Sequence, residues 1–379
     1  MSFALSSEQE EFRDTLRRFF AESSPSTEVR RLMDTDRGFD DGVWKQMAEE
    51  IGLQGVVIPE ASGGQGLSFA ELALALGEMG RVLHPSPFLG SVVLAGRAVA
   101  HAASEAERSE LLPAIAAGEL ATLAIAEPDV GRWDARGISL EATPAGDGVR
   151  LSGSKSFVLD GHTAARLLVV ARTPGSRGEE GIGLYLVEGN ATGLSRSRLD
   201  TLDATRRLAR VELDAVEARP LGDPGNAWPA LEHALCEASV ALCAEMLGGM
   251  EHVLETSVEY ARTRHQFGRA IGSFQAVKHM CADLLIGLEG ARAAVDVAVD
   301  AVVENDPELP LLASIARAHC NEAYYRAARD NIQIHGGLGA TYEFDAHLYL
   351  RRAKSSQQIL GDTSFHRELI ATELDRATA

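Results

Sequence analysis

The stretch YARTRHQFGRAIGSFQ, residues 260–275, and the stretch QIHGGLGATYE, residues 333–343, are the most informative parts of this sequence. Arg264 follows a helical pattern, and at a helix end a guanidinium can pair with a pyrophosphate. Gln275 can offer amide hydrogen bonds to the same ligand. Gly336 and Gly337 lack side chains, so their backbone can closely approach a flat or phosphorylated ligand.

The segments around these two stretches have the apolar spacing of long helices. Pro229 suits the first turn of the first of them. Helices of this length with short connections indicate an antiparallel bundle. The predicted helices span approximately 229–262, 273–303, 310–334, 344–360 and 364–376.

Before this bundle lies a region of short β-rich runs separated by Gly, Pro and Asp. No long helical pattern interrupts the region, so a compact antiparallel β domain is favoured over a parallel sheet. The predicted strands lie within 149–158, 166–172, 183–187 and 209–213.

The N-terminal region has a helical pattern again, beginning at Ser7, which we expect to be an N-cap. Further helices are predicted at 68–80 and 104–117, and Pro113 should kink or divide the second of these. The sequence therefore predicts an α+β chain with three parts. These are an N-terminal helical domain, a middle antiparallel β domain and a C-terminal bundle of the four-helix type, at residues 1–121, 122–224 and 225–379.

Composition and charge exclude several classes of protein. The chain has 379 residues, 45% of them hydrophobic, and 55 acidic against 36 basic residues, for a net charge of −19. This charge disfavours nucleic acid and anionic membranes as partners. No apolar run is long enough to span a bilayer, and the first residues do not resemble a signal peptide. The four cysteines lack metal-ligand spacing, so we expect no metal site, buried reduced thiols and a cytoplasmic location.

The two quoted stretches resemble the signatures of the acyl-CoA dehydrogenase family, as do Arg351-Arg-Ala-Lys354 and the loop from Pro59 to Gly66. The resemblance covers nearly the whole chain in the family's order. It implies an acyl-CoA substrate, an FAD cofactor and an acceptor such as electron-transfer flavoprotein. It also implies that certain residues bind the adenosine-diphosphate part of an FAD whose flavin ring lies in a neighbouring subunit. These residues are Arg264, Phe267, Gln275, Gln333, Gly336 and Gly337.

Each of these residues also has a simpler explanation. Arg264 could be a solvated cation that the helix dipole favours. Gly336 and Gly337 could only terminate a helix. Taken in family order, however, the residues together favour the cofactor role.

The family's catalytic glutamate is missing from its usual place. The ungapped match to its Tyr-Glu-Gly-Thr stretch is Ile359-Leu360-Gly361-Asp362, so Leu360 stands at the glutamate position and cannot accept a proton. Asp362 is a weak alternative base. Because it precedes a helical pattern, we favour Asp362 as an N-cap.

Some branches of the family place the base on the first helix of the C-terminal bundle. The matching position is Ala238, with Glu237 beside it. Neighbouring helical residues point about 100° apart, so Glu237 is a poor substitute. Glu245 is a further acid on this helix, and we expect it to be solvated or at an interface.

The positions that would hold the flavin ring also depart from the family. Residues 126–133, AEPDVGRW, and 157–160, FVLD, match the family's ring-binding stretches. Ala126 and Leu159 replace threonines that hydrogen-bond the flavin ring in the family, and Phe157 keeps only an aromatic wall. Bulky Arg132 and Trp133 replace small residues beside the usual substrate entrance.

These losses affect one half of the site, because the residues that would serve a neighbour's FAD are kept. The pattern resembles the non-catalytic subunit of heteromeric family members in actinobacterial sterol side-chain degradation. It implies an α2β2 heterotetramer with a homologous subunit that dehydrogenates a bulky acyl-CoA. The alternatives are a self-sufficient homotetramer with a relocated base, Asp362 or Glu237, and a flavin-free structural or acyl-binding protein.

Overall fold

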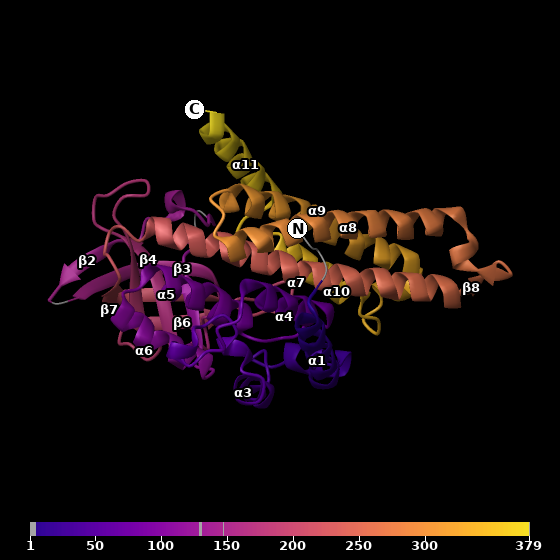
Figure 1. Cartoon of the computed structure of the whole chain (residues 1–379). Coiled ribbons are helices and arrows are strands. Elements are labelled where there is room, and N and C mark those ends of the chain that lie inside the picture. The colour runs from indigo at the N-terminus through magenta and orange to yellow at the C-terminus, as the bar shows by residue number, and fades with distance from the viewer. Residues whose placement is uncertain (1–4, 129–130, 147, 379) are drawn as a thin grey trace. The chain divides into compact units, whose positions relative to one another are not determined.

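The computed structural model of the chain describes residues 5–128, 131–146 and 148–378 (Figure 1). Its contacts group into two units, each assembled from separate stretches of sequence. The first unit comprises Met1–Arg31, Phe69–His84 and Ser239–Ala379, and the second comprises Leu32–Ser68 and Pro85–Ala238. The predicted domain bounds, 1–121, 122–224 and 225–379, stay a prediction.

Helices build the first unit. Its long C-terminal helices lie within two residues of their predicted limits, except that α10 is shorter. The cause is a change of backbone direction after residue 356, where Leu360 takes a positive φ of 61°. The helices are α1 (Ser7–Ser23), α2 (Ser26–Met33), α4 (Phe69–Arg81), α7 (Trp228–Thr263), α8 (Gln275–Glu304), α9 (Leu309–His335), η6 (Gly336–Ala340), α10 (Ala346–Ser356) and α11 (Thr363–Thr378). The last two residues of α2 and the part of α7 up to Ala238 belong to the second unit.

The first helix begins one residue later than its cap. Ser6, not Ser7, is the N-cap, because its hydroxyl accepts the amide N–H of Gln9 at 3.2 Å. The Gln9 side chain accepts the Ser6 amide in return, which completes a capping box. The prediction that Ser7 caps the helix was wrong, because only a serine three residues before Gln9 can make this reciprocal pair.

Helices α8 and α9 lie side by side and run antiparallel (Figure 1). Arg326 donates to Asp283, and His319 lies against Gly290, so the two helices advance in opposite directions. By this register the start of α8 lies level with the last turn of α9. Gln275 and Gln333 are thereby brought to the same end of the unit.

The second unit combines short helices with a sheet. Pro113 lies inside α6 and does not divide it, so of the two expected effects, a kink or a division, the division is wrong. Proline in the last turn removes one amide donor close to where the helix ends in any case. The helices are α3 (Asp41–Glu49), η1 (Leu53–Gly55), η2 (Glu60–Ser62), η3 (Leu89–Ala95), α5 (Gly96–Ala102), α6 (Glu105–Ala116) and η4 (Ala135–Gly137).

The sheet has seven strands in the order β1-β4-β5-β7-β3-β2, with β6 also paired to β7. Its pairs are antiparallel as predicted, except that β1 runs parallel to β4 and makes the sheet mixed. The strands at the two ends of this order, β1 and β2, are short. The strands are β1 (Ala121–Ala124), β2 (Ala142–Ala145), β3 (Gly148–Leu159), β4 (Arg166–Arg172), β5 (Ile182–Glu188), β6 (Leu194–Arg198) and β7 (Leu208–Leu221).

Apolar side chains on one face of this sheet form its core, among them Leu151, Val169 and Val187. Next to this core a buried ion pair joins Lys155 to Glu127, with Nζ 2.8 Å from Oε1. Burial by itself raises the pKa of Glu127, but the charge and hydrogen bond of Lys155, together with hydrogen bonds from Ser139 and the Leu140 amide, bring the pKa below its ordinary value. The pair attaches strand β3 to the segment that follows β1.

Two further sequence expectations concern helices and thiols. Among the helices of the described ranges, none has both the length and the apolar composition needed to cross a membrane. All four cysteines are free, with Cys243 and Cys320 buried. Cys236 and Cys281 are only partly buried, because each lies on a helix face that the core does not fully cover.

We expect Lys155→Met to lower the free energy of unfolding by about 3–5 kcal/mol, because it leaves the Glu127 carboxylate buried without its counter-ion. Chemical denaturation monitored by circular dichroism measures this loss. Lys155→Met combined with Glu127→Gln should recover part of it. Lys45→Met, which removes an exposed pair with Glu49, should change stability by less than about 0.5 kcal/mol. Equal losses for Lys155→Met and Lys45→Met would contradict the assigned role of the pair.

Candidate functional site

A small hairpin joins α7 to α8 and carries the first group of predicted site residues. Strands β8 (His265–Gln266) and β9 (Arg269–Ala270) pair around a two-residue turn. Both turn residues have positive φ, 54° at Phe267 and 80° at Gly268, as a tight hairpin turn requires. The hairpin projects beyond the ends of α7 and α8 (Figure 1).

The side chains of this hairpin point away from the protein's own core. Phe267 is 92% exposed and touches only the edge of the Phe274 ring, at 6.1 Å between centroids. Arg264 is exposed, and its guanidinium makes no hydrogen bond or ion pair with the described residues. An exposed phenyl ring and an unpaired guanidinium are both available to a ligand or another chain.

Gln275 and Gln333 are exposed at the same end of the unit as the hairpin. The ring of Tyr260, in the last turn of α7, stacks on His335 at the end of α9, with centroids 4.3 Å apart. This stack holds the two helix ends together. Four predicted residues, Arg264 and Phe267 with the two glutamines, therefore gather where α7, α8 and α9 meet.

Gly336 and Gly337 follow α9 at this same end. Gly336 has φ 60° and ψ −136°, a conformation that favours glycine, so helix termination accounts for it. Gly337 has no positive φ, and a Cβ added there would meet nothing within 4 Å. Neither conformation nor packing within the chain requires glycine at 337. Its backbone is open to close approach by a group from outside, which fits the adenosine-diphosphate part of FAD.

The segment that carries Leu360 is held by a fully buried arginine. Arg317 of α9 donates through Nη2 to the carbonyls of Ser356 at 3.0 Å, Ile359 at 2.7 Å and Gly361 at 3.2 Å. Within the described residues no carboxylate pairs with Arg317. The carbonyl oxygens of one short loop therefore take the place of a counter-ion.

Leu360 itself is 3% exposed and has a left-handed φ of 61°. Such a backbone is costly for a residue with a branched side chain. The Leu360 carbonyl accepts a hydrogen bond from His366 Nε2 at 3.0 Å. The loop is thus held in a specific shape, but the side chain that it presents is a hydrocarbon.

The carboxylate of Asp362 accepts a hydrogen bond at the start of α11. Its Oδ1 accepts the amide N–H of Phe365 at 2.9 Å, which is an N-cap hydrogen bond. The capping role favoured from the sequence is therefore present, and the carboxylate is directed at its own helix.

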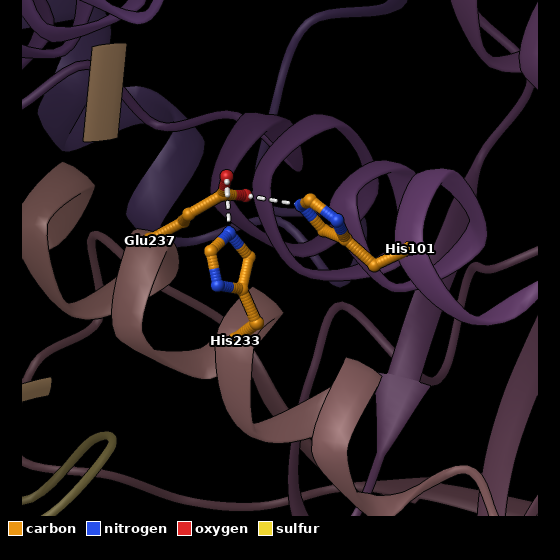
Figure 2. Close-up of side chains that lie close together, drawn as sticks. All are labelled: His101, His233 and Glu237. Carbon is orange, nitrogen blue, oxygen red and sulfur yellow. Dashed lines mark hydrogen bonds and ion pairs between the residues drawn. The ribbon is translucent and has the colours of Figure 1, made fainter. Parts of the chain in front are cut away.

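Glu237 is buried and engaged on both oxygens (Figure 2). Arg97 donates to Oε2 at 2.5 Å and to Oε1 at 2.8 Å, and Nε2 of His101 lies 3.0 Å from Oε2. Burial by itself would raise the pKa of Glu237, but these contacts and His233 hold the pKa well below its ordinary range. A carboxylate so stabilised as an anion is a weak proton acceptor. Ala238 beside it is fully buried.

The sequence suggested that Glu245 is solvated or at an interface, but its side chain is not exposed to solvent. It is buried, and its Oε1 accepts from Arg352 Nη1 at 2.6 Å. The expectation failed because Arg352 is 107 residues away in sequence, and only folding brings α10 against α7.

The positions that match the flavin-ring stretches lie in the second unit. Ala126 and Leu159 are both buried, and their side chains offer no hydrogen-bonding group, so only their backbone is polar. Both carbonyls are already used, by the amide of Ser156 and the hydroxyl of Thr122. Phe157 is 40% exposed. These positions do not fit the hydrogen-bonding side of a flavin ring.

The bulky pair beside them is also held within the chain. Arg132 donates to Asp134 at 2.6 Å, and Trp133 is buried. Asp129 and Val130, from the same stretch, lie outside the described residues.

Sequence reasoning missed two features of this site. One is the β8–β9 hairpin, although Phe-Gly at its turn is a recognisable signal. The other is Arg317, a single cation within the apolar stretch LLASIARAHC, residues 311–320. A charge on the inward side of a helix indicates a buried partner, but the sequence could not identify three backbone carbonyls as that partner.

Comparison with known proteins gives consistent matches along the chain. Models of the acyl-CoA dehydrogenase N-terminal, middle and C-terminal domains match residues 6–119, 122–216 and 225–374. Acyl-CoA dehydrogenase IpdE2 of Mycobacterium tuberculosis is 36% identical over 354 residues, which cover 93% of each chain. The predicted order of helical, β and helical parts is confirmed.

Two solved structures share this fold. The Tcur3481-Tcur3483 steroid ACAD variant is 32% identical, with 98% of each chain covered and a TM-score of 0.87. The ChsE4-ChsE5 complex of Mycobacterium tuberculosis is 27% identical, with 99% of each chain covered and a TM-score of 0.88.

We expect Asp362→Ala to lower the free energy of unfolding by about 1 kcal/mol, the usual cost of losing an N-cap. Thermal and chemical unfolding measure this change. Asp362→Asn, which can still cap the helix, should restore most of the stability. If Asp362→Asn were as unstable as Asp362→Ala, the cap would not be the reason.

Burial, aided by Arg317, lowers the pKa of His366 to about 3. An unfolded histidine titrates near 6.5, so the neutral His366 stabilises the fold above that pH. This stability is lost as the pH falls from about 6.5 towards 3, by at most about 1.4 kcal/mol per pH unit. His366→Gln should flatten the dependence of unfolding free energy on pH over this range. His279→Gln, at an exposed position, should leave it unchanged, and an unaltered slope in His366→Gln would refute the assignment.

Proposed function

The chain belongs to the acyl-CoA dehydrogenase family of FAD-dependent oxidoreductases, and from this premise we propose that it is the non-catalytic subunit of a heteromeric enzyme. The observation that carries the proposal is an asymmetry between two sets of residues. Those that would serve an FAD held by another subunit are exposed and unoccupied within the chain. Those that would hold a flavin ring and remove a proton here are apolar or engaged elsewhere.

The cofactor-facing end supports the first half of the proposal. Arg264 would pair with the pyrophosphate of the FAD, and Gln275 and Gln333 would hydrogen-bond to it. Phe267 would pack against the cofactor or the subunit that holds it, and the backbone at Gly336 and Gly337 would approach it closely. Bound FAD supplies the acceptor for the hydride that leaves the acyl-CoA.

The missing base supports the second half. Removal of the α-proton of an acyl-CoA needs a carboxylate with a raised pKa in a dry pocket. Leu360 cannot accept a proton, Asp362 caps a helix, and Glu237 is held as an anion. We therefore assign the proton acceptor to a homologous subunit with an intact glutamate.

The substrate proposed is a bulky acyl-CoA, such as a steroid side-chain thioester. A structural neighbour over 98% of the chain is a steroid ACAD, and another is a complex of two named components, ChsE4 and ChsE5. We propose an α2β2 heterotetramer with electron-transfer flavoprotein or a similar protein as acceptor. A self-sufficient homotetramer or a flavin-free acyl-binding protein would be distinguished by the flavin content of the purified chain.

Expressed alone, the chain should bind little FAD, because Ala126 and Leu159 offer no side-chain hydrogen bonds to a ring. It should show no acyl-CoA dehydrogenase activity, because Leu360 cannot accept a proton.

Co-expressed with its homologous subunit, Arg264→Ala should weaken FAD binding about tenfold to a hundredfold, as expected for one charge-assisted hydrogen bond. Fluorescence titration of FAD into the assembled complex measures this change, and turnover should fall with flavin content.

The matched control is Arg177→Ala, which removes another exposed arginine without a partner among the described residues. It should leave flavin affinity unchanged. Close to one FAD per chain in an active homotetramer would contradict the non-catalytic role. Unchanged FAD affinity for Arg264→Ala in an intact complex would contradict the role of Arg264 in the neighbour's site.

A further inference from the structure

A cluster of two histidines and a glutamate joins two helices of the second unit. His233 and Glu237 are four residues apart on α7, so their side chains lie on one face of the helix. His101, in the last turn of α5, faces them from the opposite side. Figure 2 shows both imidazole rings directed at the Glu237 carboxylate.

The spacing of the three groups suits a transition-metal cation. One ligand atom from each residue lies within 4.8 Å of the others. Nε2 of His101 lies 3.0 Å from Glu237 Oε2, and Nε2 of His233 lies 3.5 Å from Oε1. Tetrahedral zinc with bonds near 2.0–2.2 Å places neighbouring ligand atoms about 3.3 Å apart. The two separations that involve Glu237 lie close to that value on either side, and the two imidazole nitrogens lie within 4.8 Å of each other.

The chemistry of the three groups also matches. Two imidazoles and one carboxylate form a ligand set that zinc uses in proteins. Glu237 is 2% exposed and anionic, whereas His101 and His233 are partly exposed, which leaves a path for an ion to enter. Such a site also contains an open coordination position that water can occupy.

Arg97 occupies part of this site. It donates to both oxygens of Glu237, and its Nη2 lies 3.2 Å from His101 Nε2. That nitrogen cannot both accept from Arg97 and donate to Glu237, so one of its two close contacts is unsatisfied in either tautomer. Arg97 reaches the site from α5 and is partly exposed, so its long side chain can turn outward to solvent.

We propose that His101, His233 and Glu237 bind one divalent transition-metal ion of the zinc type, with Arg97 as the cation that it displaces. The ion would join α5 to the beginning of α7. The proposal does not depend on the assignment of a partner subunit, because all three ligands belong to this chain. The spacing of the cysteines predicted no metal site, but the ligands here are two histidines and a glutamate. They come from segments 132 residues apart, which only folding brings together.

The test uses the full-length chain without an affinity tag, freed of metal by a chelator and then dialysed. Calorimetric titration with Zn²⁺ at neutral pH should show one site per chain, and Co²⁺ should give a d–d absorption band. His101→Gln and His233→Gln should each weaken Zn²⁺ binding at least about a hundredfold, since even the loss of an outer-shell partner costs 10–100-fold. His279→Gln, at an exposed histidine, should bind like the wild type.

Arg97→Ala provides the distinguishing variant, because removing the competing guanidinium should tighten Zn²⁺ binding. Circular dichroism should show that each variant is folded before titration. Absence of a one-to-one site, or equal affinity in His101→Gln, His233→Gln and the wild type, would overturn the proposal. It would also be overturned if Arg97→Ala bound Zn²⁺ less tightly than the wild type, or if the cluster titrated protons without taking up metal.

Discussion

The buried guanidinium of Arg317 holds the loop between α10 and α11, which carries Leu360 at the position of the family's catalytic glutamate. A cation in the interior must be compensated, and here three carbonyls of one loop do this in place of a carboxylate. Because hydrogen bonds to a charged donor are strong, they fix the loop between α10 and α11 and sustain a left-handed backbone at Leu360. His366 adds a further bond to the same loop.

In this loop the backbone conformation is kept although the side chain that would react is absent. The backbone that would present a base is held firmly, yet its side chain is a leucine. The other acids considered as bases have also acquired structural partners: Glu237 is bound by Arg97, Glu245 by Arg352, and Asp362 by the first turn of α11. A carboxylate with such partners is stabilised as an anion and contributes to folding, so the same interactions that support the structure oppose proton transfer.

At the other end of the first unit, around the β8–β9 hairpin, the side chains make few contacts within the chain. At the β8–β9 hairpin, Phe267 is exposed and touches only the edge of the Phe274 ring, and the Arg264 guanidinium has no partner among the described residues. Gly337 has no neighbouring atom that would exclude a side chain. Residues that a chain does not use for its own fold are best explained by something outside it. Together with the apolar positions at Ala126 and Leu159, this contrast is the observation that supports our proposal of a flavin ring in another subunit.

The sequence by itself determined the long C-terminal helices and the strands β3, β4, β5 and β7, because apolar periodicity, Pro229 and the Gly-rich breaks act locally. It also identified Asp362 as a cap, since capping depends on the next three residues. The cofactor role that it predicts for Arg264, Gln275, Gln333 and the two glycines stays a prediction. Only the tertiary structure decided the parallel β1–β4 pair, the burial of Glu245 and the environment of Glu237. Arg97 lies 140 residues from Glu237, and no local pattern records which distant cation will meet a given carboxylate. The charge state of a buried acid depends on that meeting, and the chain must fold before it occurs.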